Sequence, residues 1–489
     1  MAPVKYYIFF PFVLCLLLSL AAIAEEAPSI AIRNVTVIDV IDGTLVRNQT
    51  VLIEGSRIRS IGPTDKAALP SYASVVVEGS GKYLIPGLMD MHVHIFNNVS
   101  RRPPNRWAFP LFVANGVTGV REMWTEFAQM PTVEQWRRSV SDGELLAPRI
   151  LAAGALIDGP PVSYPNMPEA TVPADGRRFV REAVQAGSDF IKVYSLLTPA
   201  VYQAIANEAR KAGIPVVGHI PLQTPVSESV RAGQVTNEHL YQVREACTNI
   251  EDQLVKERLQ FYARSHNQDE EFSFLDEQVR RTAEAYDERT CLAVAQTLME
   301  IEQWQVPTLW NEKKYFVGIS PERVSDARLA FLPPDERAVW IRDYEDNNFM
   351  YEGDLRSLRR GWERTLHVVE ALNRAGVGIL VGTDFGNSFV FPGMSVHAEM
   401  ATLVEAGLTK LEALQAATIN PALYLGATDS LGTVAEGKIA DLVLLDANPL
   451  ESISNIGRIH AVILNGQLLR RSDLDALIGH VLSTYESEE

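Results

Sequence analysis

The interpretation of this chain depends on one stretch, Leu84-Ile85-Pro86-Gly87-Leu88-Met89-Asp90-Met91-His92-Val93-His94. A short apolar run leads into two histidines one residue apart, which is the pattern of a β-strand ending in polar side chains. Alternate side chains of a strand share one face, so His92 and His94 would point together. Two neutral imidazoles directed at one point suit a divalent metal ion. Two surface histidines also reach this spacing by chance, so the rest of the chain has to distinguish a metal site from a chance pair.

The middle of the chain alternates apolar runs with helical segments, the pattern of a parallel β/α barrel or sheet. Eight candidate strands end at or near His94, Glu122, Leu156, Tyr194, His219, His239, Trp310 and Asp384. Eight is the number that a closed barrel requires. We therefore expect an α/β protein with a (β/α)8 TIM-like barrel over residues 87–425.

Both chain ends differ from this middle. Short stretches that alternate apolar and polar residues occur between Ile30 and Val77 and return between Gly432 and Gly466. They predict a small β-sandwich formed from both chain ends, residues 25–86 and 426–489. A charged, helical insertion at about 241–290 follows the sixth strand. A lid over the barrel mouth, a solvated face and a contact in a homo-oligomer are all open for it.

Composition narrows the functional class. The chain has 489 residues, 47% of them hydrophobic, and a formal net charge of -17. This balance argues against nucleic acid as a partner, because no general basic surface is available.

The N-terminus resembles a targeting signal. Lys5 is followed by the apolar run 6–20 and by the small-x-small site Ala22-Ile23-Ala24. We expect residues 1–24 to be a cleaved signal peptide rather than a membrane anchor, leaving a secreted or periplasmic protein with no membrane attachment. Of the three cysteines, Cys247 and Cys291 would remain, and a disulfide and two buried thiols are both open.

The strand ends carry the chemistry. In a parallel barrel the carboxyl ends of all strands open onto one face, where active sites lie. The predicted ends bring together four histidines, one lysine and one aspartate: His92, His94, Lys192, His219, His239 and Asp384. Their common placement predicts a metal site.

Lys192 indicates the type of site. A protonated lysine in an apolar strand would bury a charge, and its amine is a poor ligand. Reaction of the neutral amine with carbon dioxide gives a carbamate, whose two oxygens can bridge two cations. One cation would lie at the first-strand histidines, the other at His219 and His239. The alternative is a buried salt bridge between Lys192 and Asp384 with no second metal.

The order of these residues resembles the binuclear branch of the amidohydrolase superfamily. The resemblance extends through Ile85-Pro86-Gly87, Gly382-Thr383-Asp384 and the segments 392–399, 405–408, 416–422 and 437–443. Within this branch, the chain is similar to the members grouped with Xaa-Pro dipeptidases, ochratoxinase-like amidases and imidazolonepropionase-like proteins.

The resemblance implies two divalent ions, most often zinc, bound by His92, His94, Lys192, His219, His239 and Asp384. It also implies hydrolysis of an amide, in a peptide or N-acyl amino acid, by a hydroxide that bridges the metals, with Asp384 as the catalytic proton acceptor. A lactone or ester hydrolase and an inactive binding protein on the same fold are the alternatives.

Two departures bear on the substrate, which we expect to be a small molecule. Mononuclear deaminase-like relatives and true imidazolonepropionases have an acidic residue shortly after the histidine of the fifth strand. No acid follows His219 in the next four residues, which disfavours both activities. Pro221 stands where peptidase-like relatives often have a tyrosine, for which Tyr194 or Tyr241 could substitute. Three tryptophans follow predicted strands and suggest an aromatic substrate: Trp107, Trp124 and Trp310.

Overall fold

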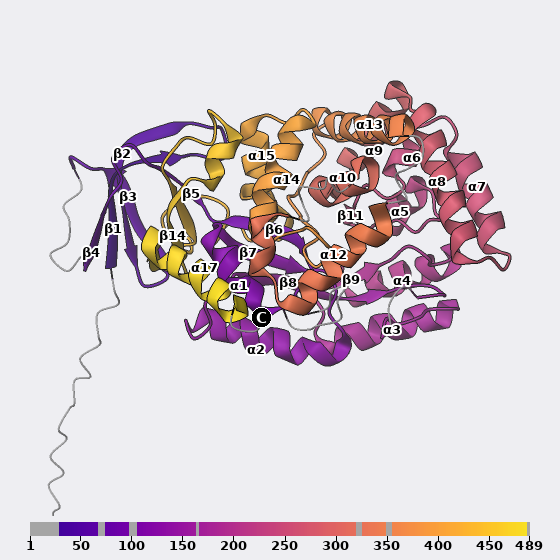
Figure 1. Ribbon diagram of the computed structural model, residues 1–489, viewed down its shortest axis with the longest axis horizontal. Helices are drawn as coiled ribbons and strands as arrows, with labels where there is room; N and C mark the ends of the chain where they lie inside the picture. The colour runs from indigo at the N-terminus through magenta and orange to yellow at the C-terminus, as the bar shows by residue number, and fades with distance from the viewer. Residues whose placement is uncertain are drawn as a thin grey trace, which may run out of the picture.

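The computed structural model describes residues 29–66, 74–96, 105–162, 166–318, 325–348 and 355–486. The expected signal peptide, residues 1–24, lies outside these ranges. The described chain is an α/β protein with one sheet at an end of the long axis and a helix-covered parallel sheet beside it (Figure 1). None of the described helices is both long and apolar enough to cross a bilayer.

Both chain ends build the end sheet, as predicted. Its strands are β1 (Ser29–Ile38), β2 (Leu45–Glu54), β3 (Arg57–Pro63), β4 (Val75–Glu78), β5 (Tyr83–Pro86), β13 (Leu442–Leu445), β14 (Ile459–Leu464) and β15 (Gln467–Arg470). They pair in the order β15-β14-β13-β5-β1-β2-β3, with β4 beside β1. Because all eight strands belong to one sheet, a two-layered sandwich is not confirmed.

The parallel sheet begins with the opening stretch of the sequence analysis. Five strands pair in the order β10-β9-β8-β7-β6: β6 (Leu88–Val93), β7 (Val117–Glu122), β8 (Arg149–Ile157), β9 (Phe190–Val193) and β10 (Val216–Gly218). Two more, β11 (Thr236–Glu238) and β12 (Trp304–Val306), pair in parallel with each other. Seven of the eight predicted segments are therefore strands, and the assigned sheets form part of a barrel.

The eighth predicted segment, 377–384, is not a regular strand. It nevertheless hydrogen-bonds to β12 through Leu380 N and Gln305 O, and to β6 through Met91 N and Val381 O. Gly382 permits this approach, because a Cβ there would lie 2.8 Å from the Cβ of His92. Steric crowding and irregular hydrogen bonding replace the regular β-ladder between this segment and its neighbours β12 and β6. A fully closed barrel therefore stays a prediction.

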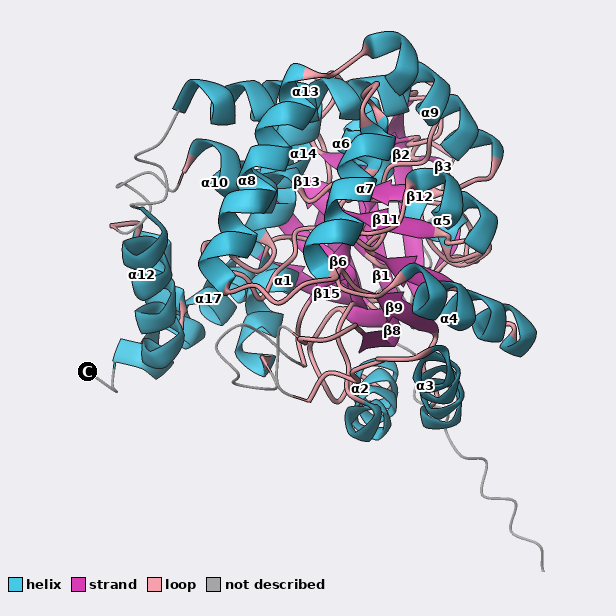
Figure 2. Ribbon diagram, turned by 90° about the vertical axis from the view of Figure 1, so that its right-hand side faces the viewer, coloured by secondary structure: helices cyan, strands magenta, loops and turns pink. Residues whose placement is uncertain are grey.

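Helices cover the parallel strands from outside (Figure 2). They are α1 (Phe109–Ala114), α2 (Met130–Ser141), α3 (Pro173–Ala186), α4 (Pro199–Ala212), α5 (Val226–Ala232), α14 (Met394–Glu405), α15 (Lys410–Ala416) and α16 (Ile419–Tyr424). The last helix, α17 (Arg471–Glu486), packs instead on α1 and on β14 and β15 of the end sheet. Helix α4 shows the local logic: the Thr198 hydroxyl accepts a hydrogen bond from Val201 N, and Gly213 ends the helix at φ 70°. Its apolar face then packs against the sheet.

The predicted insertion is helical and lies at the opposite end of the molecule from the end sheet (Figure 1). It comprises α6 (Val243–Ala246), α7 (Glu251–Tyr262), α8 (Gln268–Glu284) and α9 (Glu288–Glu300). Helix α13 (Leu355–Arg374) packs on α6, α8 and α9, and α10 (Leu309–Val317) packs on α13. Helix α12 (Pro334–Asn348) packs elsewhere, through Trp340 on Phe389 and Phe391. Asn267 and Glu270 form a reciprocal cap at the start of α8, which explains why so charged a segment forms a helix there.

Cys247 and Cys291 form a disulfide, which settles the question left open above. The bond joins the end of α6 to α9 and encloses α7 and α8 in a covalent loop, since the two cysteines are 44 positions apart. Each half-cystine is fully buried.

Replacing both cysteines with alanine is expected to lower the free energy of unfolding by about 3–4 kcal/mol, the loop-entropy value for a loop of this length. Equilibrium denaturation of the variant and of the native protein with and without reductant measures the difference. A loss below about 1 kcal/mol would show that the loop is already ordered in the unfolded chain.

Candidate metal centre and active site

His92 and His94 lie on one side of β6, at its end, as the strand pattern predicts. Their Nε2 atoms lie 3.3 Å and 2.9 Å from Oδ1 of Asp384, which follows the eighth barrel segment. Ligand atoms of these three buried residues all lie within 4.8 Å of one another. A divalent cation could therefore contact all three at once.

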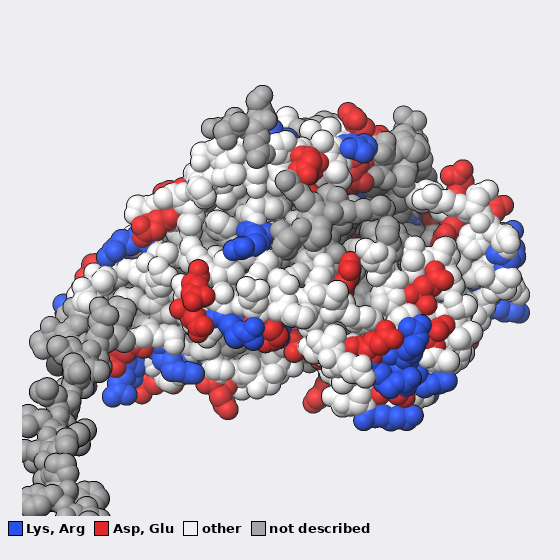
Figure 3. All heavy atoms as spheres, turned by 90° about the horizontal axis from the view of Figure 1, so that it is seen from below, with Lys and Arg blue, Asp and Glu red and all other residues white. Residues whose placement is uncertain are grey.

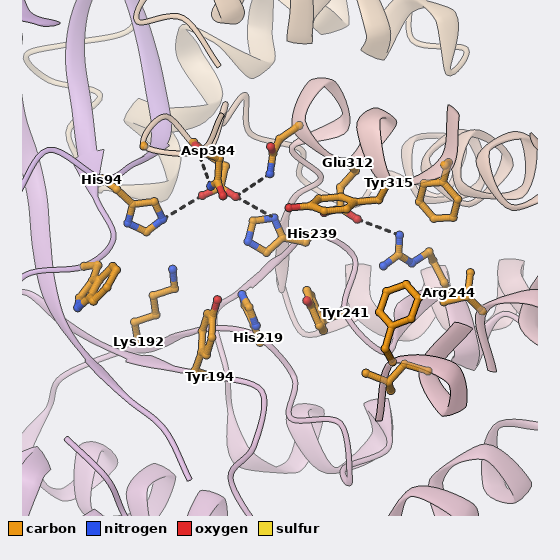
Figure 4. Close-up of a pocket in the computed structure, with 18 of the residues that line it drawn as sticks. His94, Lys192, Tyr194, His219, His239, Tyr241, Arg244, Glu312, Tyr315 and Asp384 are labelled. Atoms are coloured by element: carbon orange, nitrogen blue, oxygen red, sulfur yellow. Dashed lines mark hydrogen bonds and ion pairs between the residues drawn. The ribbon is translucent and has the colours of Figure 1, made fainter. Parts of the chain in front are cut away.

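The remaining three predicted residues converge on the same place (Figure 4). Nζ of Lys192, near the end of β9, lies 3.4 Å from Nε2 of His92. The ring of His239 lies 4.8 Å from that of His92 and 5.0 Å from that of His219, measured between centroids. The structure thus brings all six predicted side chains together.

Three residues of the site have a left-handed backbone. His239, Thr308 and Asp384 have φ angles of 60°, 48° and 62°. Residues other than glycine seldom adopt this conformation, and it clusters at functional sites because surrounding structure must hold it. His239 and Asp384 line the pocket from these positions, and Thr308 contacts Nδ1 of His239 from beside it.

Lys192 is 1% exposed, and burial lowers the pKa of its amine to about 8, against the opposing charges of Asp384, Glu238 and Glu122. Within the described residues it forms no ion pair shorter than 4 Å, so the alternative of a salt bridge with Asp384 is not observed. A neutral amine is accessible at such a pKa, as carbamate formation requires.

Asp384 lies among cationic and donor groups. Burial alone would raise the pKa of its carboxyl, but the imidazoles of His92 and His239 and the hydrogen bond with His94 hold that pKa well below its usual value. Asn311 adds a hydrogen bond, donating from Nδ2 to Oδ2 at 2.9 Å. The carboxylate is therefore ionised and fixed in orientation.

A buried Arg121–Glu238–His92 chain was not foreseen from the sequence. Arg121 donates from Nη2 to both oxygens of Glu238, at 2.9 and 3.0 Å, and Nδ1–H of His92 donates to Glu238 at 2.8 Å. This arrangement fixes the tautomer of His92, leaving its Nε2 lone pair directed at the site. The available signal was a pair of charged residues inside apolar strands, which is costly unless they meet.

Other polar residues just beyond strands hold the remaining imidazoles. Nδ1 of His219 lies 2.8 Å from Oγ of Ser195, and Nδ1 of His239 lies 2.6 Å from Oγ1 of Thr308. Nε2 of His219 is buried and has no hydrogen-bond partner in the described chain. A buried lone pair without a donor nearby is what an imidazole ligand offers a metal ion.

The residues fit a divalent metal. Imidazole nitrogens and a carboxylate oxygen are borderline ligands of the kind that zinc prefers, and they converge in a buried site with an oriented second layer. His92, His94 and Asp384 would hold one ion. The group around Lys192, His219 and His239 would hold a second only with the lysine as a carbamate.

The site opens into a pocket of about 450 Å³. Trp124 lines it, but Trp107 and Trp310 do not, so the prediction of three tryptophans at the substrate is wrong for two of them. Trp107 packs on the core beside Phe385, at 5.9 Å between ring centroids. Tyr194 and Tyr241 do line the pocket and flank the ring of His219 at 4.1 and 4.2 Å.

The surface adds no second focus on the face examined in Figure 3. Acidic and basic side chains lie interspersed there, without a broad field of one sign.

Comparison with known proteins agrees with the site. The profile of the amidohydrolase family matches residues 83–469. Imidazolonepropionase of Pyrobaculum arsenaticum is 40% identical over 105 residues, 21% of this chain and 26% of that protein. Ochratoxinase of Aspergillus niger is 43% identical over 82 residues, 16% of each chain. The chain thus matches about a quarter of the length of the first relative and less of the second.

Solved structures extend the likeness to the whole fold. Bottromycin amidohydrolase superposes with a TM-score of 0.69 at 24% identity, covering 94% of this chain and 91% of the other. A Xaa-Pro dipeptidase with bound methionine gives 0.62 at 19% identity, covering 90% and 100%. The family profile spans every predicted ligand and all strands of the parallel sheet, and on this match the chain belongs to the amidohydrolase family.

Proposed function

We propose that this protein is an exported, binuclear metal-dependent hydrolase that cleaves an amide bond in a small peptide or N-acyl amino acid. The observation that carries the proposal is the convergence of His92, His94, Lys192 and Asp384, from three different segments, on one buried point. The family match and the named amidases and dipeptidases among its relatives support hydrolysis of a carbon–nitrogen bond.

His92, His94 and Asp384 would hold one divalent ion, most often zinc, and a carbamate on Lys192 with His219 and His239 would hold another. Bound ions would activate water at neutral pH and polarise the substrate carbonyl.

The chain's own side chains supply the proton transfers and the positioning. Asp384 Oδ accepts the proton of the attacking water and returns it to the leaving nitrogen, since its carboxylate is ionised and held by Asn311. Tyr194 and Tyr241 line the same pocket and can donate a hydrogen bond to the substrate carbonyl oxygen. The Glu238 carboxylate keeps the His92 ring in one orientation.

The finer parts of the architecture belong to the proposal as well. Hydrogen bonds that link 377–385 to β12 and β6 support a closed (β/α)8 barrel. The sheet from both chain ends supports a small β-domain beside it. The Cys247–Cys291 disulfide supports export, because such bonds persist in oxidising compartments. A mature N-terminus near Glu25 in the secreted protein would confirm it.

The test is a screen of zinc-loaded protein against dipeptides and N-acyl amino acids, together with metal analysis. We expect about two zinc ions per chain and hydrolysis of an amide. Chelation should lower the rate of hydrolysis at least about 100-fold, and added zinc should restore it. Protein that carries no metal, or hydrolysis confined to lactones, would contradict the proposal.

A further inference from the structure

The pocket has two halves of different chemistry. Five of the six predicted ligands line the inner half, and the sixth, His92, lies fully buried behind them. The outer half is apolar and is built by α8, α10 and α13, from the side chains of Phe272, Leu275, Val279, Phe316 and Leu358. Phe272 is 50% exposed and lines the pocket beside Leu275 and Val279, so its ring is available to a ligand there. The insertion therefore forms a wall of the pocket, in line with the lid interpretation.

Arg244 and Glu312 form an ion pair at this outer half. Nη1 of Arg244 donates to Oε2 of Glu312 at 3.1 Å, and Figure 4 shows Arg244 across the pocket from His94 and Lys192. Both side chains are mostly buried, at 19% and 12% exposure. The positive charge of Arg244 and the negative charge of Glu312 largely cancel at a ligand in the pocket, so the pair acts on that ligand as a dipole.

The other charge lining the outer half is negative. Asp276 lies on α8, and its closest cation is the half-exposed Arg280 at 3.7 Å. Among the described residues of the outer half, no cation lacks an acidic partner. A substrate carboxylate placed there would lose its hydration and face Glu312 and Asp276, which is unfavourable in a partly desolvated pocket.

Arg244 can nevertheless hydrogen-bond to a neutral group. Its hydrogen bond to Glu312 uses Nη1, and no residue of the described chain accepts from Nε or Nη2. Neither nitrogen is a buried atom without a partner, so both reach the pocket or solvent. A carbonyl oxygen can accept from them without bringing a charge.

Taking the proposed amide hydrolysis as the basis, we propose that the substrate group in the outer half is bulky, apolar and uncharged, and presents a neutral carbonyl to Arg244. Glu312 and the α8 face determine this specificity. The favoured substrates are thus N-acyl amino acids or peptides whose carboxyl end is blocked as an amide or ester, rather than free acids. Glu312 rejects the free acid by neutralising Arg244.

Four probes test this with zinc-loaded protein: N-acetylphenylalanine, N-acetylglycine and the N-methylamide of each, with release of acetate as the readout. We expect kcat/KM for the phenylalanine N-methylamide to exceed that of the free acid, and that of the glycine N-methylamide, by about tenfold or more each. Glu312→Gln should raise kcat/KM for the free acid relative to kcat/KM for its N-methylamide by about tenfold, since no carboxylate of residue 312 then neutralises Arg244. Phe272→Ala should lower the preference for phenylalanine over glycine without changing the acid-to-amide ratio.

Glu405→Gln is the matched control, because Glu405 also pairs with a basic residue, Lys313 at 3.1 Å, but lies outside the pocket. A native preference for free acids, or an acid-to-amide ratio unchanged in Glu312→Gln, overturns the inference. Calorimetric binding of phenylalanine N-methylamide and of phenylalanine to the metal-loaded protein gives the same ranking independently of turnover. If no amide is hydrolysed, the proposed function fails, while this ranking still decides the specificity.

Discussion

Lys192→Ala is expected to reduce the bound metal from about two ions per chain to one or fewer and to lower kcat by on the order of 10³-fold. The reason is geometric: Lys192 is the group on β9 that reaches the point where the histidines of three other segments meet. Without it, no ligand joins the pair His219 and His239 to the group of His92, His94 and Asp384. Metal content by mass spectrometry and activity on a substrate found in the screen measure both effects.

Lys211→Ala serves as control, because Lys211 is 73% exposed on α4 and contacts only Glu208. Added short carboxylic acids should restore part of the metal content and activity of Lys192→Ala, since they can occupy the space of the carbamate. Full activity in Lys192→Ala, with two ions still bound, would show that the lysine is not a ligand.

Arg121→Met is expected to destabilise the protein by about 3–5 kcal/mol, as removal of one partner from a buried ion pair does. Arg121 and Glu238 are both fully buried, and the guanidinium also donates from Nε to the carbonyl of Met91 on β6. The variant leaves a carboxylate in the barrel interior with no cation against it. Equilibrium denaturation of the metal-free proteins measures the loss without interference from metal binding.

Two further variants separate charge from packing. Arg178→Met removes an exposed arginine paired with Asp175 and Glu182 and should cost far less stability than Arg121→Met, because solvent screens exposed ion pairs. Adding Glu238→Gln to Arg121→Met should recover part of the lost stability, because it removes the uncompensated charge. If Arg121→Met is as stable as Arg178→Met, the buried pair does not stabilise the fold.

The sequence placed the six candidate side chains at one site because strand geometry is strict. Side chains two residues apart share a face, and the carboxyl ends of parallel strands meet, so His92, His94, Lys192 and His219 could be placed together from their positions alone. The insertion was likewise predicted to be helical from its long, charged and helical pattern.

Where the chain leaves regular geometry, the same rules failed. Glu238 and His239 are adjacent and would face opposite sides of a strand, but the left-handed backbone of His239 lets both contribute to the site. The segment ending at Asp384 forms hydrogen bonds without forming a strand. Two tryptophans expected at the substrate lie elsewhere, because a position after a strand does not set side-chain direction. Tertiary contacts decide these features.

The junction of the two sheets has a consequence for the order in which the protein matures. β5 leads into β6 through Gly87 alone, and β5 pairs with β13, so Leu84 and Ile85 lie opposite residues 443 and 444 of the late chain. Synthesis of the chain would thus release His92 and His94 long before residues 442–445, which pair with the strand that leads into them. β5 cannot be completed until about nine-tenths of the chain has emerged. For the metal-dependent hydrolase proposed above, this order would make metal binding a late step of biogenesis, dependent on the metal supply where the whole chain folds.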